Sequence, residues 1–163
     1  LAKRLEEEGV EAVIISCAAD RAVPEACREL RVPVIGAGSA AASIALSLGS
    51  RVGILNLTDE TPEILRRVLG SHLVAEAKPK GVRTALDLLT EWGRRAAEEA
   101  LKSLSMRDID VIVLGCTGYS TIGFAKVAEE IAGVPVVDPV IAAGAITLSV
   151  LRQKAVFRPG GSL

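Results

Sequence analysis

Several residue types are scarce in this chain of 163 residues, and each scarcity excludes a class of protein. Three cysteines are too few and too scattered for a disulfide framework, so we expect a reducing, cytoplasmic setting. A net charge of −1 leaves no excess of positive charge, so we expect no nucleic-acid or membrane partner. No apolar run reaches the roughly 18 uncharged residues that a membrane span needs, and no signal peptide is visible.

Aromatic residues make up only 2% of the chain, and Asn56 and Gln153 are its only carboxamides. Because 50% of the residues are apolar, mostly aliphatic, the chain can bury a real core in one domain or two small lobes. The scarcity of thermolabile residues favours a thermophilic source, with ordinary composition bias as the alternative. His72 is the only histidine and has no ligand spacing around it, so we expect no metal site.

A segment near the N-terminus recurs later in the chain. Residues 10–17 read V-E-A-V-I-I-S-C, and residues 109–116 read I-D-V-I-V-L-G-C, at an offset of 99 residues. At an offset of 102, residues 32–35 match residues 134–137, and the match continues at Ala41/Ala143, Ile44/Ile146, Leu46/Leu148 and Ser47/Ser149. A duplicated unit with one thiol at the same place in each copy suggests a paired active site.

Short apolar runs alternate with helical patterns along the chain. The expected strands are residues 12–16, 32–35, 52–57, 72–75, 111–114 and 134–137. The expected helices are residues 1–8, 24–30, 39–48, 62–69 (capped by Asp59 or Thr61), 84–104, 121–132 and 141–153, with a frayed tail at 158–163. This alternation predicts an α/β fold with parallel sheets. Ligands bind beyond the carboxyl ends of such strands, where both Cys17 and Cys116 lie.

The second copy is preceded by a strand-like run, residues 52–57, that the first copy lacks. At the offset of 99, its counterpart would start at position −47. We therefore expect about fifty or more further residues upstream, with at least one strand and one helix; the alternative is an incomplete duplication. Residues 1–163 alone are expected to be inactive, because part of the first lobe would be absent.

The two strand-end cysteines predict a particular chemistry. A thiolate is the reactive form, and a following helix N-terminus can lower the thiol pKa. One thiolate can remove a proton from a carbon acid while an opposed thiol protonates the other face, which inverts the centre. Main-chain N–H groups around Ala18-Ala19 and Thr117-Gly118 could hold the negative charge that forms on the substrate. The alternative is that both cysteines are structural strand-end residues.

Other residues have a structural and a functional interpretation. Asp20 could bind a substrate amide or cap a helix, and Thr58 could bind substrate or start the next turn. Tyr119 could line the pocket or pack between lobes. Asp138 could cap the last helix or hold a crossing between lobes, and Cys27 is expected in the core.

The segments I-S-C-A-A-D and L-G-C-T-G-Y, with R-V-G-I-L-N-L-T between them and V-P-V-V-D-P after, resemble the Asp/Glu/hydantoin racemase superfamily, most closely its hydantoin racemase-like branch. The resemblance covers the chain to about residue 153. It implies cofactor-independent racemisation with Cys17 and Cys116 as the two acid/base thiols. It also implies two pseudo-symmetric Rossmann-like lobes with the site between them. Residues 1–48 and 139–163 would form the first, truncated lobe, and residues 49–138 the second.

Departures from the family pattern leave the substrate open. The first motif lacks the aromatic residue and the Pro-Gly that often follow this cysteine in hydantoin racemases, and the second lacks the histidine of many amino-acid racemases. The expected partner is a small carbon acid activated by an amide or carboxylate, such as a 5-substituted hydantoin or an amino-acid derivative. A homo-oligomer is compatible with the sequence.

Two alternative functions stay open at this point. A related enzyme could use the scaffold for decarboxylation or cis-trans isomerisation, which a product assay would separate. The protein could instead be a non-catalytic, two-lobed module for small-molecule binding or redox sensing, which a titration of the thiol pKa values would reveal.

Overall fold

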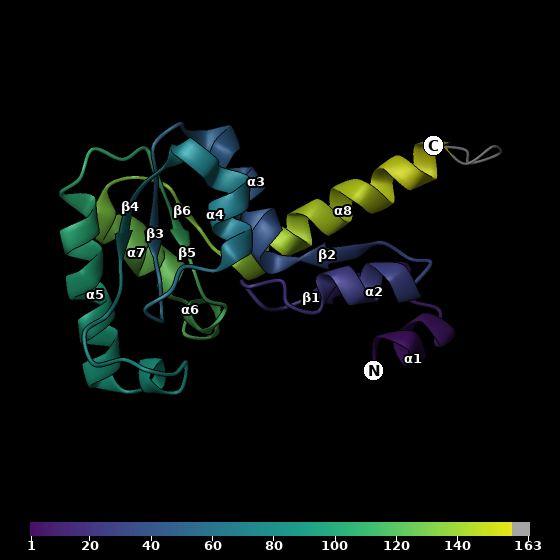
Figure 1. Cartoon of the computed structure of the whole chain (residues 1–163), viewed down its shortest axis with the longest axis horizontal. Helices are drawn as coiled ribbons and strands as arrows, with labels where there is room; N and C mark the ends of the chain where they lie inside the picture. The colour runs from purple at the N-terminus through teal and green to yellow at the C-terminus, as the bar shows by residue number, and fades with distance from the viewer. Residues whose placement is uncertain (158–163) are drawn as a thin grey trace.

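The computed structural model describes residues 1–157, with side chains through Gln153, and the predicted α/β class with parallel sheets is confirmed. One sheet pairs β1 (Val13–Ile15) with β2 (Val34–Gly36). The other has the order β4-β3-β5-β6, formed by β3 (Val52–Leu55), β4 (Leu73–Ala77), β5 (Val111–Leu114) and β6 (Val136–Val137). Figure 1 shows the two sheets in separate parts of the molecule, with the N-terminus and the far end of the last helix, which ends at Phe157, on the side of the two-stranded sheet.

Helices connect the strands as expected for βαβ units. They are α1 (Ala2–Glu7), α2 (Val23–Glu29), α3 (Ala37–Leu48), α4 (Glu63–Leu69), α5 (Glu91–Ser105), α6 (Gly118–Thr121), α7 (Phe124–Ala132) and α8 (Pro139–Phe157), with short 3₁₀ helices η1 (Gly70–His72) and η2 (Asp87–Leu89). No helix in the described part of the chain is long and apolar enough to cross a membrane. The predicted frayed tail, 158–163, lies outside the described residues.

The four-stranded sheet is covered by helices on both faces. Along β5, Val111 and Val113 belong to the cluster formed with α3 and α4, whereas Ile112 and Leu114 belong to the cluster formed with α5 and α7. All four side chains are fully buried, which explains why this strand reads as a continuous apolar run.

Helix α3 lies at the junction of the two parts. It packs on β5, β6 and α4, and also against α8, which continues over β1 and β2 (Figure 1). Fully buried Ala41, Ala42 and Ala45 let its neighbours approach closely. The proposed division at residues 48 and 138 stays a prediction.

The sequence repeat is reproduced in the hydrogen bonds of the two sheets. The Val13 N–H donates to the Pro33 carbonyl over 2.9 Å, and the Ile112 N–H donates to the Pro135 carbonyl over the same distance. These bonds are related by the offsets of 99 and 102. The two-stranded sheet therefore repeats the β5–β6 half of the four-stranded sheet.

Two of the expected helices are interrupted. The helix predicted over 84–104 is divided, because the Thr90 hydroxyl accepts the Gly93 N–H over 3.1 Å and begins α5 at Glu91. The helix predicted over 121–132 is replaced by α6 and α7, which are separated at Gly123 with its φ of +62°.

The predicted cap of α4 is wrong. This helix begins at Glu63 without a side-chain cap. Asp59 forms an ion pair with Lys78 instead, and Thr61 hydrogen-bonds to the Glu76 carboxylate. Both side chains therefore contact residues at the end of β4 and not the start of α4. Local sequence does not predict these contacts.

The core position predicted for Cys27 is also wrong. The residue is exposed on α2, a helix with no buried residue. Because α2 packs on β2 along one side only, the apolar residues of its other side, including Cys27, face solvent.

Candidate active site

Both duplicated cysteines lie just beyond the carboxyl end of a strand, as predicted. Cys17 follows β1 and Cys116 follows β5, each two residues after the strand ends. Both are free thiols and both are half-buried. Each cysteine lies between the end of its strand and the turn that follows it.

The turn that carries Cys116 is closely packed. The Gly118 N–H donates to the Cys116 Sγ over 3.3 Å where α6 begins. A Cβ atom added to Gly115 would lie 2.8 Å from the Asn56 Oδ1, and one added to Gly118 would lie 2.7 Å from the Ala85 Cβ. A side chain at either position would displace a neighbouring segment, because Asn56 and Ala85 occupy the space that its Cβ would take.

The surroundings of Cys116 favour its protonated form. Burial raises the pKa of the Cys116 thiol, the Gly118 N–H opposes this rise, and the charge of Cys17 raises the pKa further. The sequence suggested that a helix terminus could lower this pKa, but burial outweighs the single N–H.

Asp20 fixes the turn that carries Cys17. Its N–H donates to the Cys17 carbonyl over 3.0 Å, and its φ is +50°, which few non-glycine residues adopt. The buried carboxylate accepts the Gly38 N–H over 2.8 Å and the Ser39 N–H over 2.9 Å. Asp20 thus caps α3, which is the structural alternative for this residue; its two oxygens are engaged by the helix terminus.

Two glycines let the Cys17 turn lie directly on α3. A Cβ on Gly36 would lie 2.3 Å from the Asp20 carboxyl group, and a Cβ on Gly38 would lie 2.0 Å from the Ala18 carbonyl oxygen. Ala18 is buried and Ala19 is half-buried. The main chain next to Cys17 is thereby set by the start of a helix twenty residues later.

Tyr119 is a core residue, so its predicted pocket-lining role is wrong for this structure. It is fully buried, its ring lies 5.4 Å from that of Phe124, and its hydroxyl donates to the Asn56 carbonyl over 2.8 Å. Burial, and then the charge of Cys116, raise the pKa of Tyr119, so it remains a neutral donor. Tyr119 therefore ties the Cys116 turn to the end of β3.

A polar chain at the end of β3 was missed by the sequence analysis. The Asn56 Nδ2 donates to Thr61, whose hydroxyl donates to Glu76, and Glu76 also pairs with Arg66 at 2.9 Å. The Asn56 Oδ1 is buried and has no partner among the described residues. The only asparagine of an apolar chain, placed at a strand end, was the available signal.

The remaining predicted site residues have mixed roles. Thr58 is exposed and its hydroxyl donates to the Glu60 carbonyl over 3.1 Å, so it forms a turn. Thr117 is half-buried beside Cys116. Asp138 caps α8, as one prediction had it: its Oδ1 accepts the Val140 N–H over 2.8 Å, and also the Ser120 hydroxyl over 2.7 Å. No cluster that could hold a metal ion occurs within residues 1–157.

Known proteins are similar to this chain in sequence and fold. The family model of the Asp/Glu/Hydantoin racemases matches residues 1–146. Hydantoin racemases of Pseudomonas sp. (strain NS671) and Rhizobium meliloti are 29% and 31% identical over 86% and 85% of this chain. A solved allantoin racemase from Klebsiella pneumoniae is 28% identical over 94% of the chain, with a TM-score of 0.80.

This chain spans only part of each of these proteins. It covers 58% and 59% of the two hydantoin racemases and 64% of the allantoin racemase. The part matched by the family model contains both strand-end cysteines and most of the repeat that relates them. The family match over most of the chain, the parallel α/β fold and the paired cysteines agree: the chain belongs to the Asp/Glu/hydantoin racemase family.

Proposed function

We propose that this chain carries the two acid/base thiols of a cofactor-independent racemase or epimerase. One observation carries the proposal: Cys17 and Cys116 each lie two residues beyond the carboxyl end of equivalent parallel strands of a repeat. The charge of Cys17 also contributes to the raised pKa of Cys116. In this proposal the two parallel sheets are the centres of two pseudo-symmetric lobes, and the substrate binds between the cysteines.

The reaction proceeds by proton transfer alone. In one direction Cys17, as thiolate, takes the proton from the substrate carbon, and the electron pair of the broken C–H bond delocalises onto the adjacent carbonyl. Cys116, as thiol, then delivers its proton to the opposite face, so a new C–H bond forms with inverted configuration. The raised pKa of Cys116 suits it to be the proton donor in this direction. The opposite enantiomer uses the two groups in exchanged roles.

The negative charge formed on the substrate needs hydrogen-bond donors near both thiols. The Gly118 N–H already donates to the Cys116 Sγ, so it stabilises the thiolate of that cysteine when the proton has left. The N–H groups of Ala18, Ala19 and Thr117 and the Thr117 hydroxyl are the remaining candidates to hold the substrate oxygen. Asp20 contributes indirectly, since its cap on α3 holds the Ala18-Ala19 main chain in place.

The substrate proposed is a small carbon acid whose proton is activated by an amide or carboxylate. The chain is similar to hydantoin and allantoin racemases, and this similarity favours a cyclic ureide as its substrate. A 5-substituted hydantoin is the first such compound to test. Such a substrate needs no cofactor, because its ring carbonyl accepts the electron pair.

The test is racemisation in D₂O with the full-length protein and a single enantiomer of a 5-substituted hydantoin. We expect loss of optical purity together with incorporation of one solvent deuterium at the inverted carbon. Cys17→Ser and Cys116→Ser are expected to lower the racemisation rate by about 100-fold or more, because each removes one proton-transfer group.

Cys27→Ser is the matched control, because Cys27 is exposed on α2 and has no partner in the repeat. Its rate is expected to equal that of the unmodified protein. Racemisation that survives both Cys17→Ser and Cys116→Ser would rule out the two-thiol mechanism. Release of CO₂ without inversion would assign decarboxylation instead.

A further inference from the structure

The N-terminus of α8 is capped by a carboxylate, and so is the N-terminus of α3. Asp138, the residue before α8, accepts the N–H of Val140 over 2.8 Å and the N–H of Ile141 over 3.1 Å through its Oδ1. The offset of 102 relates these two donors to the two residues of α3 that donate to Asp20. The two helices of the repeat are therefore capped at equivalent N–H groups by carboxylates that are not equivalent in sequence.

The two carboxylates occupy the same place in the two copies of the repeat. The counterpart of Asp138 before α3 is Gly36, and a Cβ there would lie 2.3 Å from the Cγ and the Oδ2 of Asp20. The Asp20 carboxylate thus fills the space that the side chain of Asp138 takes in the second copy. In the first copy the carboxylate belongs to the Cys17 turn itself, three residues after the thiol. The cap of α3 is therefore also the attachment of that turn to the helix.

In the second copy, Ser120 supplies the corresponding attachment. Its hydroxyl donates to the Asp138 Oδ1 over 2.7 Å, and it lies in α6, four residues after Cys116. The cap of α8 is complete without this bond, because two N–H groups of the helix already donate to the same oxygen. Since α6 is only four residues long, the bond of Ser120 fixes the Cys116 turn to the start of α8.

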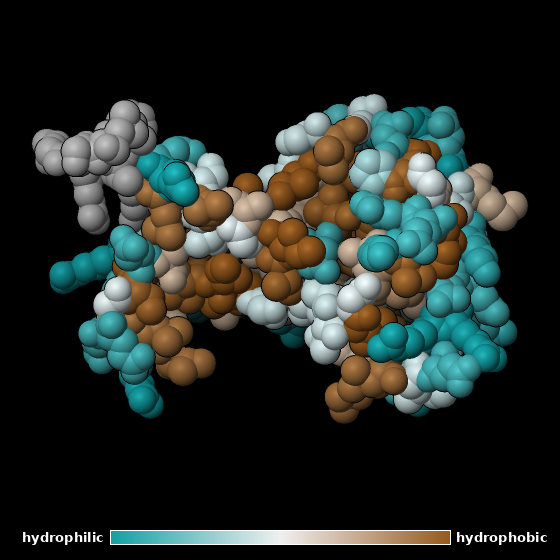
Figure 2. Space-filling view, turned by 180° about the vertical axis from the view of Figure 1, so that it is seen from behind, coloured by the Kyte–Doolittle hydropathy of each residue, from teal (hydrophilic) through white to brown (hydrophobic). Residues whose placement is uncertain are grey.

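The surroundings of Asp138 make this bond important to the carboxylate as well. Asp138 is 7% exposed and lines a mostly aliphatic groove with Ile44, Val137 and Ala142. Figure 2 shows hydrophobic residues over much of the junction between the two parts of the molecule. A carboxylate buried among such residues is costly unless hydrogen bonds engage it. Within residues 1–153, Ser120 is the one side chain that donates to it.

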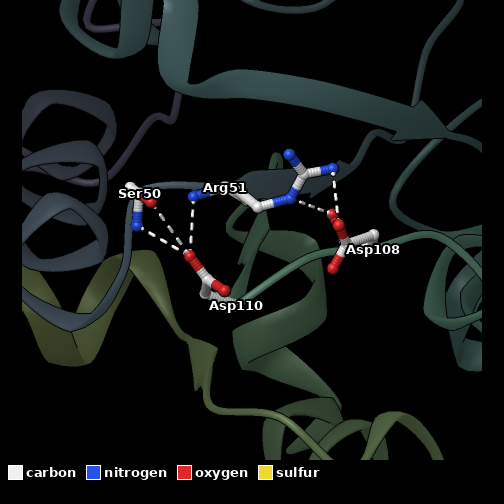
Figure 3. A network of polar contacts seen from close by, with 4 residues as sticks. All are labelled: Ser50, Arg51, Asp108 and Asp110. Carbon is white, nitrogen blue, oxygen red and sulfur yellow. Dashed lines mark hydrogen bonds and ion pairs between the residues drawn. The ribbon is translucent and has the colours of Figure 1, made fainter.

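Asp110, at the other end of β5, shows a carboxylate clamp that reaches neither thiol. Its Oδ2 accepts the N–H of Ser50 over 2.8 Å and the N–H of Arg51 over 2.9 Å (Figure 3). Every hydrogen bond that this carboxylate accepts within residues 1–153 comes from these two residues, at the start of β3. Asp138 differs because one of its three donors belongs to the Cys116 turn.

We propose that Asp138 and Ser120 are positioning residues for Cys116, which hold its turn on the start of α8 as Asp20 holds the Cys17 turn on the start of α3. Helices α3 and α8 pack against each other, so the two attachments place both thiols relative to one pair of helices. This role rests on the proposed function, in which Cys116 exchanges a proton with the substrate. Asp138 and Ser120 act through the placement of the thiol and not through a contact with the substrate.

The first test measures the placement of Cys116 without turnover. Alkylation of Cys116 and Cys17 by iodoacetamide is followed by peptide mass spectrometry in the full-length protein and in Ser120→Ala. Burial raises the pKa of the Cys116 thiol, so a turn released from α8 exposes the thiol and gives more thiolate at neutral pH. We expect Cys116 to react about 3- to 10-fold faster, which is the effect of one hydrogen bond on a local opening equilibrium. The rate of Cys17 is expected to stay the same, and Ser120→Thr, which keeps the hydroxyl, should restore most of the original Cys116 rate.

The second test measures racemisation of a 5-substituted hydantoin. Ser120→Ala is expected to lower kcat at least about 10-fold with little change in KM, because a misplaced thiol slows proton transfer and leaves substrate binding intact. Asp138→Ala should do the same, whereas Asp138→Asn keeps an Oδ1 acceptor and should retain most of the rate. Asp110→Asn is the matched control, because it alters a clamp of the same kind at the other end of β5. It is expected to lower the urea midpoint without changing kcat or the alkylation of Cys116.

Two results would overturn the proposal. One is an equal rate of Cys116 alkylation in Ser120→Ala and in the unmodified protein. The other is a change in Cys116 alkylation that Asp110→Asn reproduces, because general loosening of the four-stranded part would then explain it. If the unmodified protein does not racemise hydantoins, the proposed function fails by itself, and the alkylation rates still decide whether Ser120 and Asp138 place Cys116.

Discussion

Replacing Gly38 by alanine gives the sharpest prediction about how the candidate site is held. The new Cβ would lie 2.0 Å from the carbonyl oxygen and 2.8 Å from the carbonyl carbon of Ala18, where real Cβ atoms stay beyond 3.0 Å. The obstacle is main chain, which cannot rotate away as a flexible side chain does. The Ala18 peptide must therefore move by about 1 Å or more, and overpacking of this kind costs about 1–3 kcal/mol.

The displacement reaches Cys17 directly, because Ala18 is the next residue. A misplacement of about 1 Å at a reacting group can lower a rate by about 100-fold. We therefore expect Gly38→Ala to lower the urea midpoint, to alter the alkylation rate of Cys17 by iodoacetamide, and to leave that of Cys116 nearly unchanged. Peptide mass spectrometry separates the two thiols.

Gly144→Ala is the matched control in the helix that corresponds to α3. A Cβ there meets no atom within 4 Å, so alanine is expected to stabilise α8 by about 0.5–1 kcal/mol. If Gly38→Ala were as stable as the original chain and Cys17 were alkylated at the same rate, the argument that α3 sets the Cys17 turn would be refuted.

Three further predictions concern charge and capping. Cys17→Ser is expected to lower the pKa of Cys116, because it removes the charge that raises it; the pH dependence of Cys116 alkylation measures this, and an upward shift would contradict it. The N–H groups of Arg51 and Ser50 lower the pKa of Asp110 below its ordinary value near 3.8, so its stabilisation is complete above that value and is lost as pH falls through the lowered one. Asp110→Asn should therefore reduce the urea midpoint at neutral pH but not in strong acid; an equal loss at both would point to packing. Thr90→Ala should cost about 1 kcal/mol of unfolding free energy through loss of the α5 cap, and an unchanged urea midpoint would show that the cap contributes nothing.

The strands were predictable where burial is complete on both faces. Residues 111–114 were predicted as a strand and form β5 with the same bounds, because helices cover both sides and every position is apolar. The prediction of a single helix over 84–104 failed for the opposite reason. Its apolar spacing continues through Thr90, but the hydrogen bonds of Asp87 to Arg83 and Thr84 close a turn before α5. A local turn of this kind outweighs helical periodicity.

The two thiols were predictable and their environment was not. A cysteine recurs after each of two equivalent strand segments, so the sequence alone was sufficient to predict that both thiols lie at strand ends. The contacts of Gly38 with Ala18, of Gly118 with Ala85, and of Asn56 with Gly115 join segments that are 20 to 59 residues apart. No local pattern encodes such contacts, because they depend on how the strands are ordered in the sheet.

The order of residues is enough to assign the fold class, the repeat and the placement of one thiol just beyond a strand in each copy. Buried parallel strands and helical spacing are local properties, so they can be read from the order of residues. Three properties of the site come from the folded structure: burial raises the pKa of Cys116, Asp20 caps α3, and Tyr119 belongs to the core. These properties depend on desolvation and on contacts across the sheets, which exist only once the strands have paired.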